Sequence, residues 1–185
     1  IRIRGRGAFE LGGRVAIEHE PVSGDERAPA IRVTVYGEVR IREGAALEAG
    51  PTGAVELETG DRVVVEEGAR LEDAAAWTVG ARSLDVGARV RAALGDVRVV
   101  AETSAVLAEG AELRARGAEL ALVAGSVTLG PEAHLVGAGP SGTGVRVEAG
   151  DRVEVSSGAR IVSEGAVCER RGQVRVRVGG PWVGR

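Results

Sequence analysis

Short runs in which apolar and polar residues alternate fill this chain, and glycines separate them. Residues 39–41, 97–99 and 153–155 are examples of these runs. Alternation over three to five residues is the period of a β-strand that buries one face. Glycine accommodates positive φ at the bends between such strands. The pattern therefore predicts many short strands joined by tight turns, rather than helices.

One long motif occurs twice. The segment 60–71, GDRVVVEEGARL, returns at 150–161 as GDRVEVSSGARI, with eight of the twelve positions identical. Weaker copies lie between the two, each with an alternating strand, a short turn, an alanine and an aliphatic residue two places later. The alanines are Ala45, Ala69, Ala88, Ala111, Ala133 and Ala159. Their spacing varies from 19 to 26 residues, with a mean close to 23, so the chain consists of repeats of that length.

Each repeat holds three strand-like pieces, because another alternating run precedes the two described above. These additional runs are 55–57, 77–79, 97–99, 120–122 and 145–147. Leucine-rich repeats need a helical piece and an Asn or Cys position, and propeller blades are longer. Three strands per repeat predict an all-β parallel β-helix of about eight coils, each of 22–23 residues. Coils of this length with turns of unequal length favour the right-handed form.

Stacking the repeats sorts the third strand into inward and outward positions. The inward positions are aliphatic or small: Leu47, Leu71, Val90, Leu113, Leu135 and Ile161, beside the six alanines. The outward positions between them are Ala46, Arg70, Arg89, Glu112, His134 and Arg160. The first strand gives outward Glu56, Thr78, Arg98, Ala121 and Arg146, and the second gives Arg40, Val64, Asp85, Leu107, Thr128 and Glu154.

The whole chain, 1–185, is predicted to form one solenoid domain. Residues 39–178 carry the regular coils. Residues 1–38 are less regular, and 18–30, which include Pro21 and Pro29, read as a protruding loop. The chain starts at Ile1 without a signal-like segment, so we expect it to begin after processing or inside a longer protein.

Composition narrows the functional classes. The formal net charge is -3, which disfavours nucleic-acid binding because that binding needs a cationic surface. All 24 basic residues are arginine. No apolar run approaches the roughly 18 residues of a membrane span. Aromatic residues are 2%, so the core must be aliphatic. Cys168 is the one cysteine, which excludes an intrachain disulfide and a multi-cysteine metal site.

Candidate chemistry is sparse. Glycan-cleaving enzymes need paired carboxylates, but the outward columns do not concentrate acids, and Asp61 and Asp151 lie four coils apart. Of the histidines, His134 is expected on the surface, and His19 offers no metal-ligand spacing with it. The glycine-rich segment 137–144 lacks the lysine of a phosphate loop. We therefore expect no enzymatic activity, no cofactor and no metal.

Two sets of residues are candidates for binding. Outward arginines form a candidate face for an anionic ligand such as a glycan: Arg70, Arg89 and Arg160. Apolar residues of the terminal strands and of outward positions are candidates for self-association: Ile1, Ile3, Val64, Leu107, Val176 and Val178. Unpaired strand edges template further pairing, so more coils or another copy of the chain should cover the ends.

The repeats also carry a resemblance. Segments such as 12–17 (GGRVAI), Ser23-Gly24, Tyr36-Gly37 and 144–161 look like coil boundaries in large bacterial surface proteins. These are adhesins and fibre proteins built on right-handed parallel β-helices of the pectin-lyase-like class. The resemblance implies a scaffold at the cell surface or outside the cell. The chain departs from this class in having no Asn, which such proteins stack in internal ladders.

The function expected from the sequence is a non-enzymatic structural or adhesive β-solenoid of a cell-surface or extracellular fibre. It would associate end to end or continue into further coils, with glycan as a second candidate partner, and without nucleic-acid binding or membrane insertion. Two alternatives remain open. One is a cytoplasmic polymerising scaffold of the bactofilin type, whose coils are shorter. The other is a polysaccharide-binding or polysaccharide-cleaving β-helix.

Overall fold

The structure is a computed structural model that describes residues 1–16, 29–93, 95–116, 118–138, 143–164, 173–178 and 182–184. These residues form strands and turns without a helix. The strands are β1 (Arg2–Gly5), β2 (Phe9–Leu11), β3 (Arg14–Ala16), β4 (Pro29–Val35), β5 (Val39–Ile41), β6 (Ala46–Thr59), β7 (Arg62–Val65), β8 (Arg70–Val86), β9 (Arg89–Ala92), β10 (Val97–Leu107), β11 (Glu112–Ala115), β12 (Leu120–Leu129), β13 (His134–Gly137), β14 (Thr143–Val155), β15 (Arg160–Ser163), β16 (Gln173–Val178) and β17 (Trp182–Gly184).

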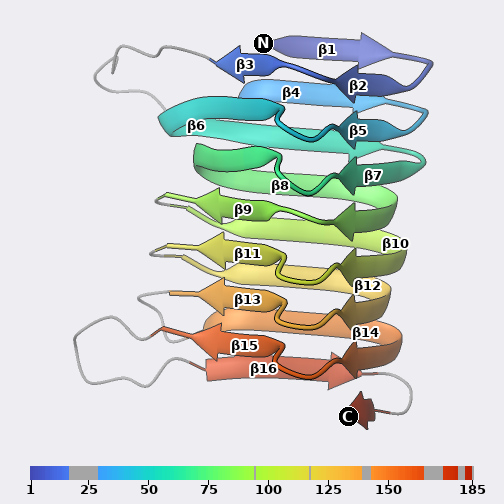
Figure 1. The fold of residues 1–185 in the computed structure, drawn as a ribbon, viewed down its shortest axis with the longest axis vertical. Helices are drawn as coiled ribbons and strands as arrows, with labels where there is room; N and C mark the ends of the chain where they lie inside the picture. Colours follow the sequence, from blue (N-terminus) through green and yellow to red (C-terminus); the bar gives the residue numbers. More distant parts are fainter. Residues whose placement is uncertain are drawn as a thin grey trace.

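The strands wind into a right-handed parallel β-solenoid, which confirms the predicted fold class. In Figure 1 the chain crosses the back from left to right, returns along the front from right to left, and descends one level. The paired strands of the described residues run parallel; β10, for example, lies between β8 and β12. We call the three sides of a coil the first, second and third side. In one coil they are represented by residues 97–101, 104–107 and 112–115.

The inward residues of each side stack in register. On the first side the column is Ile3, Val33, Leu57, Val79, Val99, Leu122, Val147 and Val176. The described residues thus give eight levels on the first and second sides and seven on the third. Five coils have a paired neighbour above and below on all three sides, whereas the sequence predicted about eight coils in total.

A four-residue turn leads from the second side to the third in most coils. At Ala108–Ala111 the Ala111 amide donates to the Ala108 carbonyl (3.2 Å), and Gly110 has a φ of 68°. Gly44, Gly68 and Gly158 occupy the same position with positive φ, as does Glu132 at 54°. Positive φ strains side chains other than glycine, so the glycines of the repeat are needed there. The turn between β8 and β9 has only two residues, Gly87 and Ala88, which accounts for part of the short 19-residue spacing between Ala69 and Ala88.

The turns also continue the ladder between coils. The Glu66 amide donates to the Ile41 carbonyl (2.9 Å), and the Gly130 amide donates to the Leu107 carbonyl (2.7 Å). One corner of the coil therefore keeps backbone pairing where an ordinary loop would break it. This continuity limits how far each coil can rotate over the next.

Three expectations about strand positions are corrected. Ala105 and Leu107 face inward and are fully buried, whereas Val106 faces outward, because Leu107 pairs with Val86 and Leu129. The outward placement of Leu107 was therefore wrong by one residue. The strand β2 was not predicted, although Phe9 pairs with Val39 in the regular stack. Pro29 and residue 30 belong to β4 rather than to the predicted loop, whose residues 18–28 lie outside the described part of the chain.

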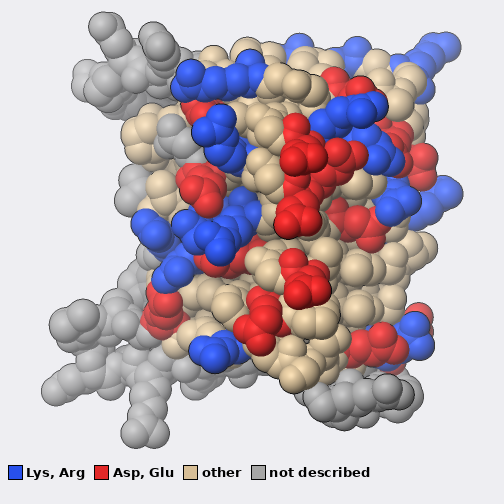
Figure 2. Space-filling model, in the orientation of Figure 1, with Lys and Arg blue, Asp and Glu red and all other residues tan. Residues whose placement is uncertain are grey.

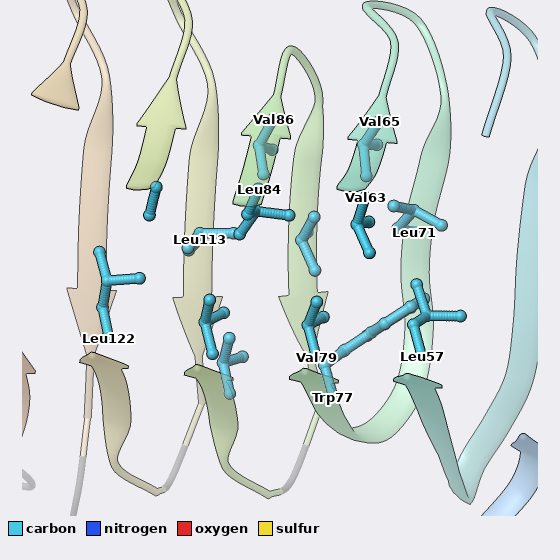
Figure 3. Close-up of a cluster of buried hydrophobic side chains, with 14 of the residues drawn as sticks. Leu57, Val63, Val65, Leu71, Trp77, Val79, Leu84, Val86, Leu113 and Leu122 are labelled. Atoms are coloured by element: carbon cyan, nitrogen blue, oxygen red, sulfur yellow. The ribbon is translucent and has the colours of Figure 1, made fainter. Parts of the chain in front are cut away.

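The core fills the interior of the coils with aliphatic side chains and one ring. Trp77 replaces an aliphatic residue in the stack between Val55 and Val97 and is 1% exposed. Its Nε1 donates to the carbonyl of Arg91 (3.1 Å), which satisfies the buried polar atom. Figure 3 shows the ring extending toward Leu57 of the neighbouring coil. The expectation of a wholly aliphatic core was therefore wrong at this position.

Candidate functional site

The third side presents the candidate anion-binding face. Arg70 and Arg89 are backbone partners on adjacent levels, and both side chains are exposed. Glu112 and His134 separate Arg89 from Arg160 on the same outward column. The structure therefore brings Arg70 and Arg89 together, about 4.8 Å apart along the axis, and leaves Arg160 three levels beyond Arg89.

Two of the six residues expected outward on this side are covered. Ala46 is buried because its methyl group lies between the longer side chains of its paired neighbours, Arg14 and Arg70. Glu112 is 8% exposed although its position faces outward. Its Oε1 accepts a hydrogen bond from Arg91 Nε (3.1 Å) and lies 3.7 Å from Arg114 Nη1. Burial at these positions comes from neighbouring side chains.

The Glu112 carboxylate is part of a network of alternating charge. Arg91 also reaches Glu72 Oε1 (3.5 Å), and Arg114 Nη2 donates to Glu164 Oε1 (2.7 Å). The hydrogen bond to Glu112 raises the pKa of the Arg91 guanidinium above its ordinary value. The charges of Arg91 and Arg114 are therefore satisfied by protein carboxylates.

Arg70 and Arg89 differ from these arginines because neither makes an ion pair with a described residue. Like charges directly opposite each other on paired strands are unfavourable. An anion between the two guanidinium groups would relieve that repulsion and would accept their hydrogen bonds. This pair is the part of the predicted arginine face that has the geometry of an anion site.

A band of acidic side chains lies beside the third side. Figure 2 shows these side chains down the middle of the face, over the turns that lead into the third side, with arginines on both flanks. The four-residue turns supply several of the carboxylates: Glu43, Glu67, Glu109 and Glu132. The sequence-based predictions considered the strand columns alone and therefore did not include this acidic band. The sign that could have revealed it is the recurring Glu-Gly pair at 43–44, 67–68 and 109–110.

The second side shows why one self-association candidate is covered. Val64 faces outward between its partners Arg40 and Asp85, yet it is only 9% exposed. Arg40 Nη1 donates to Glu66 Oε1 (2.9 Å), and this hydrogen bond is the main cause of the lowered pKa of the Glu66 carboxyl. Arg62 forms an ion pair with Asp85. The paired charged side chains therefore cover Val64, and it does not offer a lateral apolar contact.

The remaining self-association candidates lie on the outermost coils. Leu107, as shown above, is in the core. Ile1 is 54% exposed, whereas Ile3 and Val176 are partly buried against the core. The side chain of Val178 lies outside the described residues. Of these candidates, those whose described side chains stay accessible, Ile1, Ile3 and Val176, therefore lie at the axial ends of the stack.

The residues considered for chemistry are dispersed. Asp61 and Asp151 are exposed and precede the second-side residues Arg62 and Arg152, four levels apart, roughly 19 Å at the strand spacing. That separation is too long for an acid and base acting on one bond. His134 is half-buried, and its Nε2 has no hydrogen-bond partner among the described residues. His19 and Cys168 lie outside the described part.

The described residues contain neither a group of metal ligands nor a helix that could span a membrane. Within that part of the chain, no three or more His, Cys, Asp and Glu residues are grouped so that they could hold a metal ion. No helix there has the length and apolar composition needed to cross a membrane. Comparison of the chain with protein-family models, curated proteins and solved structures gives no match.

Proposed function

We propose that this chain is a non-enzymatic structural or adhesive β-solenoid, part of a cell-surface or extracellular fibre of the pectin-lyase-like class. Another coil continues the stack at its axial faces, supplied either by the same polypeptide or by a second copy. The solenoid provides length, rigidity and a surface for display. The resemblance of the repeats to surface adhesins supports this location.

The observation that carries the proposal is the incomplete cover of the outermost coils. Inward residues in the middle of the stack are buried, for example Val33, Ile41 and Leu135 at 0% exposure. On the outermost described levels Leu11 is still buried, at 8%, but five other inward residues are only partly buried: Ile3, Phe9, Val15, Ile161 and Val176. Apolar surface and strand edges of this kind are stabilised when another coil pairs with them.

A non-catalytic role is supported by the distribution of carboxylates. Several outward acids form ion pairs with arginines. Examples are Glu56 with Arg32 and Asp85 with Arg62. Carboxylate oxygens that are occupied by a guanidinium are less available to act on a substrate. The distance between Asp61 and Asp151 points the same way. The absence of enzymatic activity remains a prediction.

The test is sedimentation velocity and electron microscopy of the 185-residue chain over a range of concentrations. We expect oligomers that lengthen with concentration, and we expect the double variant Ile3→Glu/Phe9→Glu to shorten them. Arg89→Glu, on a lateral face, is the matched control and should leave their length unchanged. A strictly monomeric particle at high concentration, with slow amide exchange in β1, β2 and β3, would overturn the axial contact.

A further inference from the structure

The corner between the first and second sides carries a trough of about 640 Å³ near one end of the solenoid. It lies at the right-hand edge of Figure 1, where β1 turns into β2 and β4 turns into β5. Its volume is within the range of small-molecule sites, and its open shape suits part of a long ligand. The lining residues are Arg4, Gly5, Arg6, Thr34, Val35, Tyr36, Glu58, Thr59 and Gly60.

Two outward columns form the trough. Arg4, Thr34 and Glu58 are paired across three levels. Arg6, Tyr36 and Gly60 each follow one residue after the paired Gly5, Val35 and Thr59. Strand register therefore sets two arginines, one ring, one hydroxyl and one carboxylate along a single corner.

Tyr36 is the most informative of these residues. It is 76% exposed, although large aromatic side chains usually bury most of their surface. Gly60 is next to it on the following level and has no side chain to cover the ring. The corner therefore presents an aromatic surface at a place where the fold gains nothing from it.

The charges around the ring are also unused by the fold. Arg4 and Arg6 are exposed, and neither makes an ion pair with a described residue. Thr59 contrasts with them, because its buried hydroxyl donates to the Gly37 carbonyl and supports the turn. The trough thus combines free guanidinium donors, the Thr34 hydroxyl and the acceptor oxygens of Glu58.

From this combination we infer that the trough binds a saccharide carrying an anionic group, sulfate or carboxylate. The apolar face of a pyranose ring packs on Tyr36, and the anionic group takes the donors of Arg4 and Arg6. Glu58 and Thr34 hydrogen-bond the sugar hydroxyls. A nucleic-acid strand fits less well, because Glu58 would repel its phosphates and the chain's net charge is -3.

This inference deepens the adhesive part of the proposed function, since it names a ligand class, but it does not require fibre formation. A monomer that binds the saccharide would support the trough even if axial association failed. Conversely, a fibre without saccharide binding would leave the solenoid role standing. The two proposals therefore fail separately.

The experiment is calorimetric titration of the chain with four probes: a sulfated glycosaminoglycan tetrasaccharide, an oligogalacturonate, a neutral cello-oligosaccharide and inorganic sulfate. We expect at least one anionic saccharide to bind more tightly than the neutral one and than sulfate alone. The two anionic arms distinguish sulfate from carboxylate. Circular dichroism of every variant checks that the coil has folded.

Matched variants locate the site. Tyr36→Ala and the double variant Arg4→Ala/Arg6→Ala should each weaken binding at least about tenfold, as expected for an anchor residue. Tyr36→Phe keeps the ring and should stay within about threefold of the wild type. Arg98→Ala removes an exposed arginine that lies outside both the trough and the third-side arginine pair, and it should have no effect.

Several outcomes would overturn the inference. Binding that survives Tyr36→Ala, or that is lost in Arg98→Ala, would place the ligand elsewhere. Equal affinity for inorganic sulfate would show a plain anion contact without sugar recognition. Absence of binding to both anionic saccharides would exclude the proposed ligand class.

Discussion

The inward and outward columns of the third side lie one residue apart in the sequence, but the burial of their side chains has different causes. In the inward column, Leu47, Leu71, Val90, Leu113 and Leu135 are all at most 5% exposed. In the outward column, exposure runs from fully buried Ala46 through Glu112 to exposed Arg70 and Arg89. Alternation determines which way each Cβ points. It does not determine how far the neighbours cover an outward side chain.

The largest expected effect breaks the inward column. Leu113→Asp places a carboxylate between Val90 and Leu135, where nothing can pair with it, and should cost about 4 kcal/mol or more. Urea unfolding of the variant measures this cost. Leu113→Val keeps the site apolar and should cost about 1 kcal/mol. Equal losses for the two variants would show that the position is not enclosed.

A smaller effect tests whether outward Glu112 behaves as a buried residue. Glu112→Gln keeps the shape but removes the charge that Arg91 and Arg114 share, and should cost about 1–3 kcal/mol. Chemical unfolding at low salt gives the value. Glu109→Gln, in the adjacent turn, is the matched control and should cost under about 0.5 kcal/mol. Identical small losses would mean that the Glu112 contacts contribute nothing.

The turns offer a third comparison, between glycine and glutamate at the same position. Gly110→Ala has free space for its methyl group but must adopt a positive φ, so it should lose about 1 kcal/mol. Glu132→Gly relieves the same strain, but glycine also makes the unfolded chain more flexible, which offsets part of the gain. The variant should therefore be neutral or slightly stabilising. Thermal unfolding of both variants checks the opposite signs. A loss at Glu132→Gly larger than that at Gly110→Ala would contradict the strain argument.

The smallest effect concerns the exposed arginine pair. Arg89→Ala should change stability by under about 0.5 kcal/mol. Because it removes a like-charge neighbour of Arg70, the change should favour the variant at low salt and fade as salt is added. Unfolding midpoints at low and high salt test this. A salt-independent loss would show that Arg89 packs rather than repels.

The sequence was sufficient for the inward pattern and much less so for the surface. Strict repetition of aliphatic positions and alanines predicted the fold class, since each inward residue has the same environment in every coil. The predicted inward and outward assignment failed at Leu107 because its neighbour Val106 is equally apolar, so the hydrophobic pattern does not show which of the two faces inward. The four-residue step from the last inward residue to the turn alanine, as from Ile41 to Ala45, holds in the other coils except at Val86 to Ala88, and it would have corrected the assignment.

The candidate site was harder to predict for a physical reason. To predict the arginine face, one must know which arginines already form ion pairs with carboxylates. Arg91 and Arg114 pair with Glu112, and these contacts depend on side-chain rotamers. Their alternation pattern is the same as that of Arg89. The trough at Tyr36 needed the register of three coils, and the first of these depends on β2, which the pattern did not reveal.

Because each coil pairs with the coils directly above and below it, the stacking also determines how the molecule unfolds. Backbone partners of each level lie on the two adjacent levels, so stability along the axis is a sum of nearest-neighbour terms. Amide exchange should then be slowest in the middle levels, around β10 and β11, and should quicken level by level toward both axial faces. A single defect in the middle would divide the stack into two shorter units that unfold independently, so damage to a long fibre of such coils would remain local.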